Sequence, residues 1–140
     1  MTLSRVIQEA IPLADAVRKY WSTELPKWHP NYPMVGAGEK SPPPPPERKK
    51  LRELLTRQAE DTIYQLLLVM YLGRGDFGPG ELAEHFESLK EQFATPREAI
   101  AQLMGKAPLG DYLAEGLSAL NQAGLDPDRL ALTPARSTPS

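Results

Sequence analysis

The sequence contains no cysteine and only two histidines, His29 and His85. Disulfides, thiolate metal sites and a cysteine nucleophile are therefore excluded, and the composition fits a reducing, cytoplasmic compartment. The nearest approach to a metal-ligand cluster is Glu81, Glu84 and His85. No Glu-x-x-His pair accompanies it, although di-iron helical bundles require two such pairs. We expect neither a metal nor a cofactor.

Net charge and long hydrophobic runs are also scarce. Sixteen basic and eighteen acidic residues give a formal charge of −2, so the overall charge does not indicate a nucleic-acid partner. A local basic cluster, Arg48, Lys49, Lys50 and Arg52, is interpreted as a solvated helix face. The longest apolar run has seven residues, whereas a membrane span needs roughly 20. Since the N-terminus also lacks a continuous apolar signal segment, we expect no membrane partner and no secretion.

The usual catalytic motifs are missing. No serine lies in a G-x-S-x-G elbow, and no glycine-rich loop has the remaining residues of a phosphate-binding motif. An enzymatic role is therefore not favoured. A helix-turn-helix is the DNA-binding alternative for Pro96–Leu120, but its second helix carries Asp111 and Glu115 and no lysine or arginine. A recognition helix needs base-reading and phosphate-binding side chains, so this one would repel DNA.

What the sequence does contain is helical periodicity, and no strand pattern competes with it. We predict an all-α fold, a compact bundle of about five helices in one domain over residues 1–124. The predicted helices are Leu3–Trp21 (one kinked helix through Pro12), a region from Glu47 to Leu72 with a break near Gln58–Asp61, Pro79–Phe93, a short helix after the Thr95-Pro96-Arg97-Glu98 capping box, and Pro108–Gly124. Residues 22–46 are predicted to form an irregular, proline-rich connection. Residues 125–140 are predicted to form a short turn and a disordered tail.

The run Leu66–Leu72 is the element around which we expect the other helices to pack. A helix that is apolar on every side must be surrounded by protein. Gly73 and Gly75 follow it and are predicted to supply the positive-φ residues of a turn. Gly116, on the apolar face of the last helix, is predicted to allow another helix to approach closely.

Candidate ligand or interaction residues gather around this turn. Charged residues on a rigid loop are common in binding sites. Arg74 and Asp76 are therefore the first candidates for a ligand or interaction site. Asp111 and Tyr112 are added on the hypothesis that the turn packs against the start of the last helix, with Arg74 paired to Asp111. The alternative for Asp111 is a favourable place in the first turn of its own helix. Trp28 is included because exposed tryptophans are uncommon.

Two stretches resemble a bacterial domain family of unknown function. Residues 68–77 read Leu-Val-Met-Tyr-Leu-Gly-Arg-Gly-Asp-Phe, and residues 107–117 read Ala-Pro-Leu-Gly-Asp-Tyr-Leu-Ala-Glu-Gly-Leu. They are similar to an apolar-Gly-Arg-Gly-Asp signature and a Pro-Leu-x-Asp-Tyr-Leu-x-x-Gly-Leu signature of that family. The resemblance implies a small helical bacterial protein. It brings no established reaction, so it assigns no catalytic residue.

Two functions of different classes follow. The favoured one is a cytoplasmic interaction or adaptor module, which binds an unknown protein partner or forms a homodimer through exposed helix faces. The alternative is a small-ligand binder or enzyme that uses the Arg74–Asp76 turn together with Tyr112 or Trp28. A pocket holding Arg74, Asp76 and Asp111 together would favour the alternative.

Overall fold

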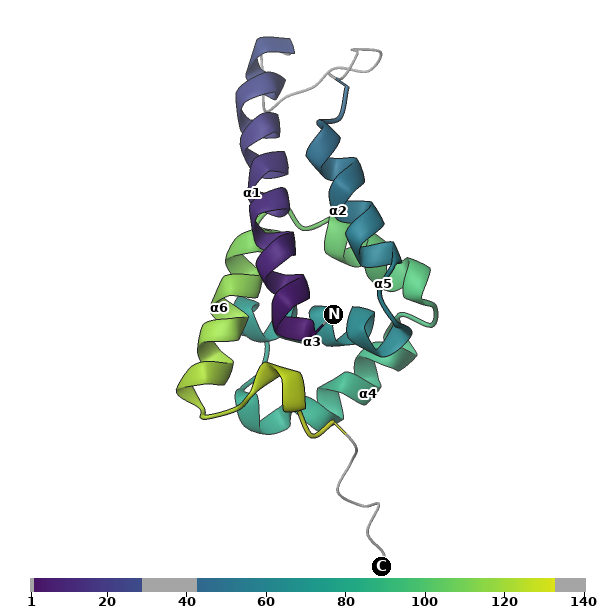
Figure 1. The fold of residues 1–140 in the computed structure, drawn as a ribbon, viewed down its shortest axis with the longest axis vertical. Helices are drawn as coiled ribbons and strands as arrows, with labels where there is room; N and C mark the ends of the chain where they lie inside the picture. The colour runs from purple at the N-terminus through teal and green to yellow at the C-terminus, as the bar shows by residue number, and fades with distance from the viewer. Residues whose placement is uncertain (1, 29–42, 133–140) are drawn as a thin grey trace, which may run out of the picture.

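The computed structural model describes residues 2–28 and 43–132, and within them it contains helices and no strands (Figure 1). The elements in chain order are α1 (Leu3–Trp28), α2 (Pro46–Thr56), α3 (Glu60–Arg74), the 3-10 turn η1 (Pro79–Glu81), α4 (Leu82–Gln92), α5 (Pro96–Met104), α6 (Leu109–Gln122) and the 3-10 turn η2 (Pro127–Arg129). The all-α bundle is confirmed. None of the helices in these two ranges is long and apolar enough to cross a membrane.

The helix α1 is longer than its sequence pattern predicts. It passes continuously through Pro12, as expected, but it also includes Pro26 and ends at Trp28. The prediction of irregular structure from residue 22 is therefore wrong for residues 22–28. Trp21 and Leu25 remain half-buried on this last part of the helix. Since a proline removes only one helical hydrogen bond, Pro26 near the end does not force the helix to stop. The rest of the predicted connection, residues 29–42, lies outside the described residues.

The predicted break between α2 and α3 is present. Pro45 is extended, with φ −71° and ψ 155°, and Pro46 is the first residue of α2, where its missing N–H removes no helical bond. At the other end of α2, the Gln58 side-chain amide donates to the Leu54 carbonyl at 2.8 Å. Ala59 is then extended, so a new helix starts at Glu60. This break explains why the described residues contain six α-helices instead of about five.

The helix α3 lies at the centre of the bundle, as predicted. Every residue from Leu66 to Leu72 is buried, and α3 packs against α1, α4, α5 and α6. The hydroxyl of the buried Tyr64 donates to the Phe93 carbonyl at the end of α4. Burial raises the pKa of Tyr64, because the phenolate would be desolvated, and Glu60 and Glu98 raise it further.

Glycines let α6 lie unusually close to α3. A Cβ atom built on Gly116 would stand 2.2 Å from the Val69 carbonyl oxygen, and one on Gly73 would stand 1.8 Å from the Tyr112 carbonyl oxygen. The close approach predicted for Gly116 is thus observed. Gly73, however, has no positive φ and belongs to α3. The prediction that it forms part of the turn is wrong. Glycine is needed at this position because a larger side chain would collide with α6.

The two ends of the described chain meet on one side of the bundle. The Ser4 backbone N–H and hydroxyl donate to the two carboxylate oxygens of Asp128, at 2.8 and 2.7 Å. Leu132 is buried in the common core. The short turn expected after Gly124 is η2, and these contacts fasten it to the start of α1, as the yellow and purple segments of Figure 1 show.

Truncation of the central helix tests its place in the core. Leu67→Ala and Met70→Ala are each expected to lower the free energy of unfolding by about 2–5 kcal/mol, because each removes a fully buried side chain. Urea titration followed by circular dichroism measures the change. The exposed Glu87→Ala on α4 is the control, with a loss below about 0.5 kcal/mol. Surface-like losses at both core residues would contradict the central position of α3.

The close approach of α3 and α6 makes a second prediction. Gly116→Ala is expected to destabilise the protein by about 1–3 kcal/mol or more, since the added methyl group meets a backbone oxygen that cannot rotate away. Gly80→Ala is the matched control, because a Cβ atom there meets nothing within 4 Å. Equal melting temperatures for the two variants would show that the helices can separate without loss.

Candidate functional site

The predicted candidate residues begin at the end of α3, where Gly75 closes the helix. Gly75 is left-handed, with φ 91°. Its N–H donates to the Leu72 carbonyl at 3.0 Å, and the Asp76 N–H donates to the Tyr71 carbonyl at 3.1 Å. This pair of bonds is a Schellman motif, which satisfies the last carbonyls of a helix. The positive φ predicted for Gly75 is confirmed.

Arg74 and Asp76 form a closed pair across this motif. The Arg74 Nε and Nη2 atoms donate to the two carboxylate oxygens of Asp76, at 2.9 and 2.7 Å. The guanidinium also lies 4.9 Å from the centre of the Tyr71 ring. The hydrogen bond from Arg74 lowers the pKa of Asp76, and the same bond raises the pKa of Arg74. Because the guanidinium and the carboxylate bind each other through two hydrogen bonds, neither group is free to bind a ligand in this conformation.

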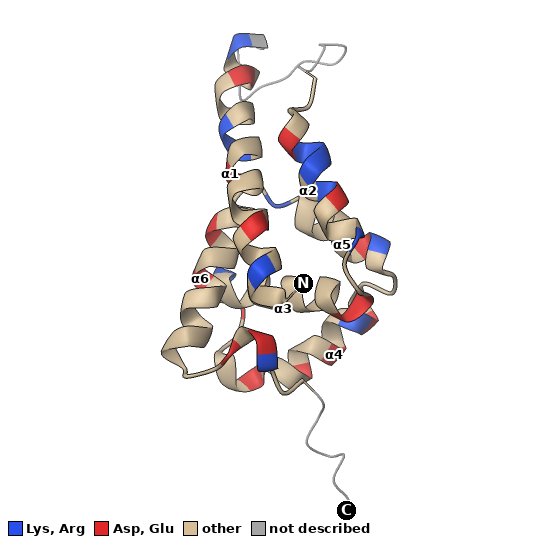
Figure 2. Ribbon diagram, in the orientation of Figure 1, with Lys and Arg blue, Asp and Glu red and all other residues tan. Residues whose placement is uncertain are grey.

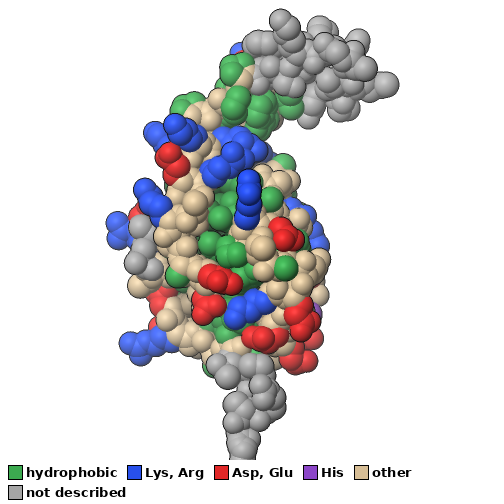
Figure 3. All heavy atoms as spheres, turned by 90° about the vertical axis from the view of Figure 1, so that its right-hand side faces the viewer, with side chains coloured by type: hydrophobic (Ala, Val, Ile, Leu, Met, Phe, Trp, Pro, Cys, Tyr) green, Lys and Arg blue, Asp and Glu red, His purple; other side chains and the backbone are tan. Residues whose placement is uncertain are grey.

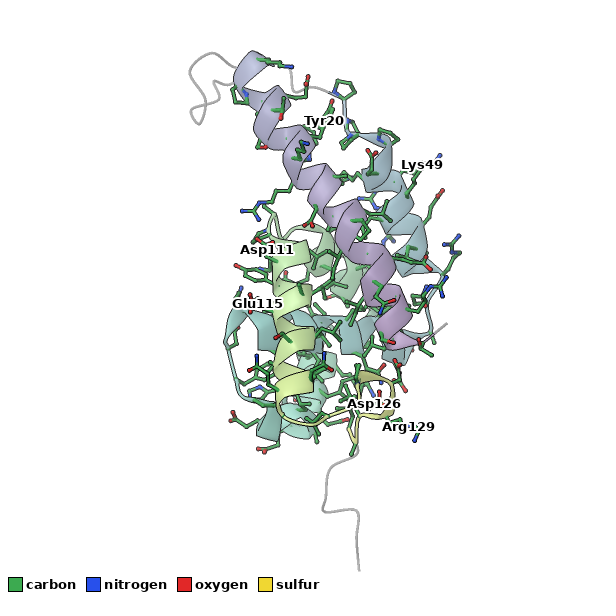
Figure 4. All side chains as sticks on the ribbon, turned by 60° about the vertical axis from the view of Figure 1, so that its left-hand side comes forward. Tyr20, Lys49, Asp111, Glu115, Asp126 and Arg129 are labelled. Atoms are coloured by element: carbon green, nitrogen blue, oxygen red, sulfur yellow. The ribbon has the colours of Figure 1, made fainter. Side chains whose placement is uncertain are left out.

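The predicted pairing of Arg74 with Asp111 is wrong. Asp111 accepts from Arg18 of α1 at 2.6 Å, and Figure 4 shows Asp111 and Glu115 on the outer side of α6. Arg74 takes Asp76 because the turn places that carboxylate only two residues away. What packs on the start of α6 is the last part of α3, since a Cβ atom on Gly73 would meet the Tyr112 backbone. Trp28 ends α1, and its side chain lies outside what the structure describes.

A hollow of about 340 Å³ lies beside the turn. Its lining includes Arg74, Asp76, Phe77 and His85, but not Asp111. The Phe77 and His85 rings stack with their centres 4.0 Å apart. Within the two described ranges, no group of three or more potential metal ligands is found here or elsewhere. The pocket that would have united Arg74, Asp76 and Asp111 is therefore not formed.

A second hollow, which no sequence motif indicated, lies between the upper parts of α1 and α2 and the α5–α6 turn. It has a volume of about 500 Å³, within the range of ordinary ligand sites. We name it the α1–α2 hollow. Its apolar lining comes from all three elements: Ala14, Val17 and Trp21 of α1, Leu51 of α2, and Met104, Ala107 and Leu109 around the turn.

Three cationic side chains also line the α1–α2 hollow. Arg18 comes from α1, Arg48 from α2 and Lys106 from the α5–α6 turn. Arg18 is paired with Asp111, in a contact where both side chains are at least half exposed, so the pairing contributes little to stability. No carboxylate of the described residues lies within ion-pair distance of Arg48 or Lys106.

Charge is unevenly distributed over the helices that surround this hollow. Basic residues crowd the first half of α2, whereas α6 carries only acidic charges (Figure 2). Sequence reasoning recognised the basic cluster that includes Arg48, but interpreted it as a solvated face. It missed Lys106 and the apolar lining, because the hollow is assembled from three separate stretches of the chain, residues 14–22, 48–51 and 104–109. No local motif marks such a site.

The closed Arg74–Asp76 pair predicts a pH dependence of stability. The pKa of Asp76 is lowered in the folded protein, so the pair contributes stability above the ordinary carboxylate pKa and loses it as the pH falls through the lowered value. Asp76→Asn is therefore expected to have a lower melting temperature than the wild type at pH 7, and the difference should shrink towards pH 2. Glu87→Gln, an exposed carboxylate on α4, is the control. A difference that stays constant from pH 7 to pH 2 would contradict the pairing.

Comparisons with known proteins identify a family but no activity. No curated protein and no solved structure is detectably similar to this chain. A family described as "Protein of unknown function (DUF3775)" matches residues 48–122. This range includes α2 from Arg48 onward, α3 to α6, the turn after α3 and two of the three walls of the α1–α2 hollow. The match covers more than half of the 140 residues, and the chain therefore belongs to this family of unknown function, DUF3775.

Proposed function

We propose that this chain is a bacterial, cytoplasmic interaction module that binds a partner protein in the α1–α2 hollow. The observation that carries the proposal is the combination of an apolar lining with cations from three separate elements. An interface of this kind buries an apolar anchor in its centre and places charged groups at its edge. The location is supported by the absence of cysteine, and the bacterial source by the two sequence signatures.

Charge complementarity indicates the chemistry of the partner. Arg48 and Lys106 face the hollow from two elements, and neither has a carboxylate partner among the described residues. A partner segment that combines an apolar side chain with neighbouring aspartate or glutamate would place its apolar group among Val17, Leu51 and Leu109. Its carboxylates would then lie beside the two cations, which favours binding and also the rate of encounter.

The Arg74–Asp76 turn is the weaker alternative. A small-ligand site needs convergent polar groups that are free to bind, but here the arginine and the carboxylate bind each other. The hollow beside the turn is also smaller, about 340 Å³ against 500 Å³. We therefore assign this turn to the closure of α3.

Site-specific photocrosslinking in the native host tests the proposal. A photoreactive amino acid replaces Ala107, an exposed residue that lines the hollow. The matched control replaces Ala114, which is exposed on α6 and lines none of the described hollows. A defined adduct is expected from residue 107 alone, and sequencing of the crosslinked peptide should show an apolar residue beside acidic ones. Adducts of the same pattern from both positions, or none from residue 107, would contradict the proposal. A crosslink to a second copy of this chain would show that the hollow is a homodimer interface and that no separate partner occupies it.

Charge reversal tests the electrostatic part. Arg48→Glu is expected to reduce the residue-107 adduct by about tenfold, because the partner's carboxylates would meet a like charge. Lys49→Glu makes the same change of charge one residue away, on a side chain that points away from α1 (Figure 4) and does not line the hollow. Its adduct should keep nearly the wild-type yield. Equal losses in both variants would mean that only net charge matters.

A further inference from the structure

A larger hollow lies on the other side of the contact between α2 and α5. It has a volume of about 670 Å³, and we name it the α2–α5 hollow. Ile63, Ile100, Ala101 and Met104 give it an apolar floor, while Arg52 and Arg97 stand at its edge. The turn after α3 does not contribute to this hollow.

The two hollows are neighbours, because α2 and Met104 contribute to both. Met104 lines both of them. On α2, Arg48 lines the first hollow, and Arg52 and Thr56 line the second. Their four-residue spacing places the three side chains on one face of the helix, over about 12 Å at a rise of 1.5 Å per residue. The same face of α2 thus borders both hollows, and we name the surface that includes the two hollows the trough.

Charge changes along this trough. At the α1–α2 hollow the cations are Arg48 and Lys106, beside the paired Arg18. The α2–α5 hollow has an acidic residue, Glu60, in its lining together with Arg52 and Arg97. Figure 3 shows the same trend on the face where α2 and α5 lie: basic side chains gather in its upper part, acidic ones lie lower, and hydrophobic side chains are exposed between them.

We propose that the trough binds one amphipathic helix of the partner at two points, an extension that rests on the function proposed above. One apolar anchor enters the α1–α2 hollow, and a second, about two helical turns away, enters the α2–α5 hollow. Two turns of a helix span about 11 Å, which matches the length of the α2 face. The acidic residues of the partner helix lie at the end that meets Arg48 and Lys106.

A helix suits this surface better than an extended segment. The described residues contain no strand, so they offer no sheet edge to which an extended chain could pair. Grooves between helices instead accept apolar side chains at helical spacing. The apolar floor, with Met104 between the two hollows, provides such a groove.

Two synthetic helical peptides test the two-point arrangement on the full-length protein. The first carries glutamates at one end and a single leucine anchor next to them. The second adds another leucine about two turns further along the same face. Binding of fluorescein-labelled peptides is measured by anisotropy. The two-anchor peptide is expected to bind about tenfold more tightly than the single-anchor peptide.

Three tryptophan substitutions at exposed alanines separate the hollows. Ala107→Trp fills the first hollow, Ala101→Trp fills the second, and Ala114→Trp lies in neither. Ala107→Trp should weaken both peptides about tenfold, Ala101→Trp only the two-anchor peptide, and Ala114→Trp neither. Thermal melting verifies that each variant is folded.

The outcomes distinguish the two proposals. If Ala101→Trp leaves the two-anchor peptide unaffected while Ala107→Trp weakens both peptides, the two-point trough is wrong and the α1–α2 hollow remains the binding site. If neither peptide binds, or if Ala107→Trp has no effect on either, the function proposed for the α1–α2 hollow fails and the two-point arrangement fails with it.

Discussion

The near contact between the backbones of α3 and α6 is the constraint on which the rest of the structure depends. Gly73 and Gly116 have no room for a side chain at this crossing, so α6 lies against the most buried helix of the protein. Gly110, one and a half turns before Gly116, is likewise close to α1, where an added Cβ would stand 2.1 Å from an Asp15 carboxylate oxygen and 3.3 Å from the Ile11 carbonyl oxygen. The position of α6 therefore also sets the position of the α5–α6 turn, and with it Lys106.

Much of the fold could be predicted because its signals are local. The apolar run Leu66–Leu72 indicated a surrounded helix, and the Thr95 hydroxyl does accept from the Glu98 N–H, as the capping box predicts. Gly73 shows where such reasoning fails. Glycine is required both where φ is positive and where two helices cross closely. Because Gly75 lies two residues further on, a positive φ was predicted for Gly73 as well. Only the partner helix distinguishes them, and that partner is about forty residues away in the sequence.

The candidate site was less predictable for a related reason. Arg74 and Asp76 were candidates because they are charged and only two residues apart, yet this short separation is what allows them to pair with each other. Arg48 and Lys106 are unremarkable in sequence, and each acquires its surroundings from other elements. Asp111 illustrates the same point, since its partner Arg18 belongs to a helix ninety-three residues earlier. A charged residue that pairs with a neighbour in sequence stabilises a local turn. Charged residues from distant parts of the chain form a common surface only after folding.

The proposed binding surface lies partly inside and partly outside the residues that match the family. The family match begins at Arg48, so the α2–α5 hollow lies entirely within it. The α1–α2 hollow takes one wall, with Val17 and Trp21, from the preceding helix. Gly75 is accounted for by the closure of α3, and Gly73, Gly110 and Gly116 by close helix crossings. These glycines therefore fix the scaffold, and the surface proposed for binding is built from α1, α2, α5 and the α5–α6 turn.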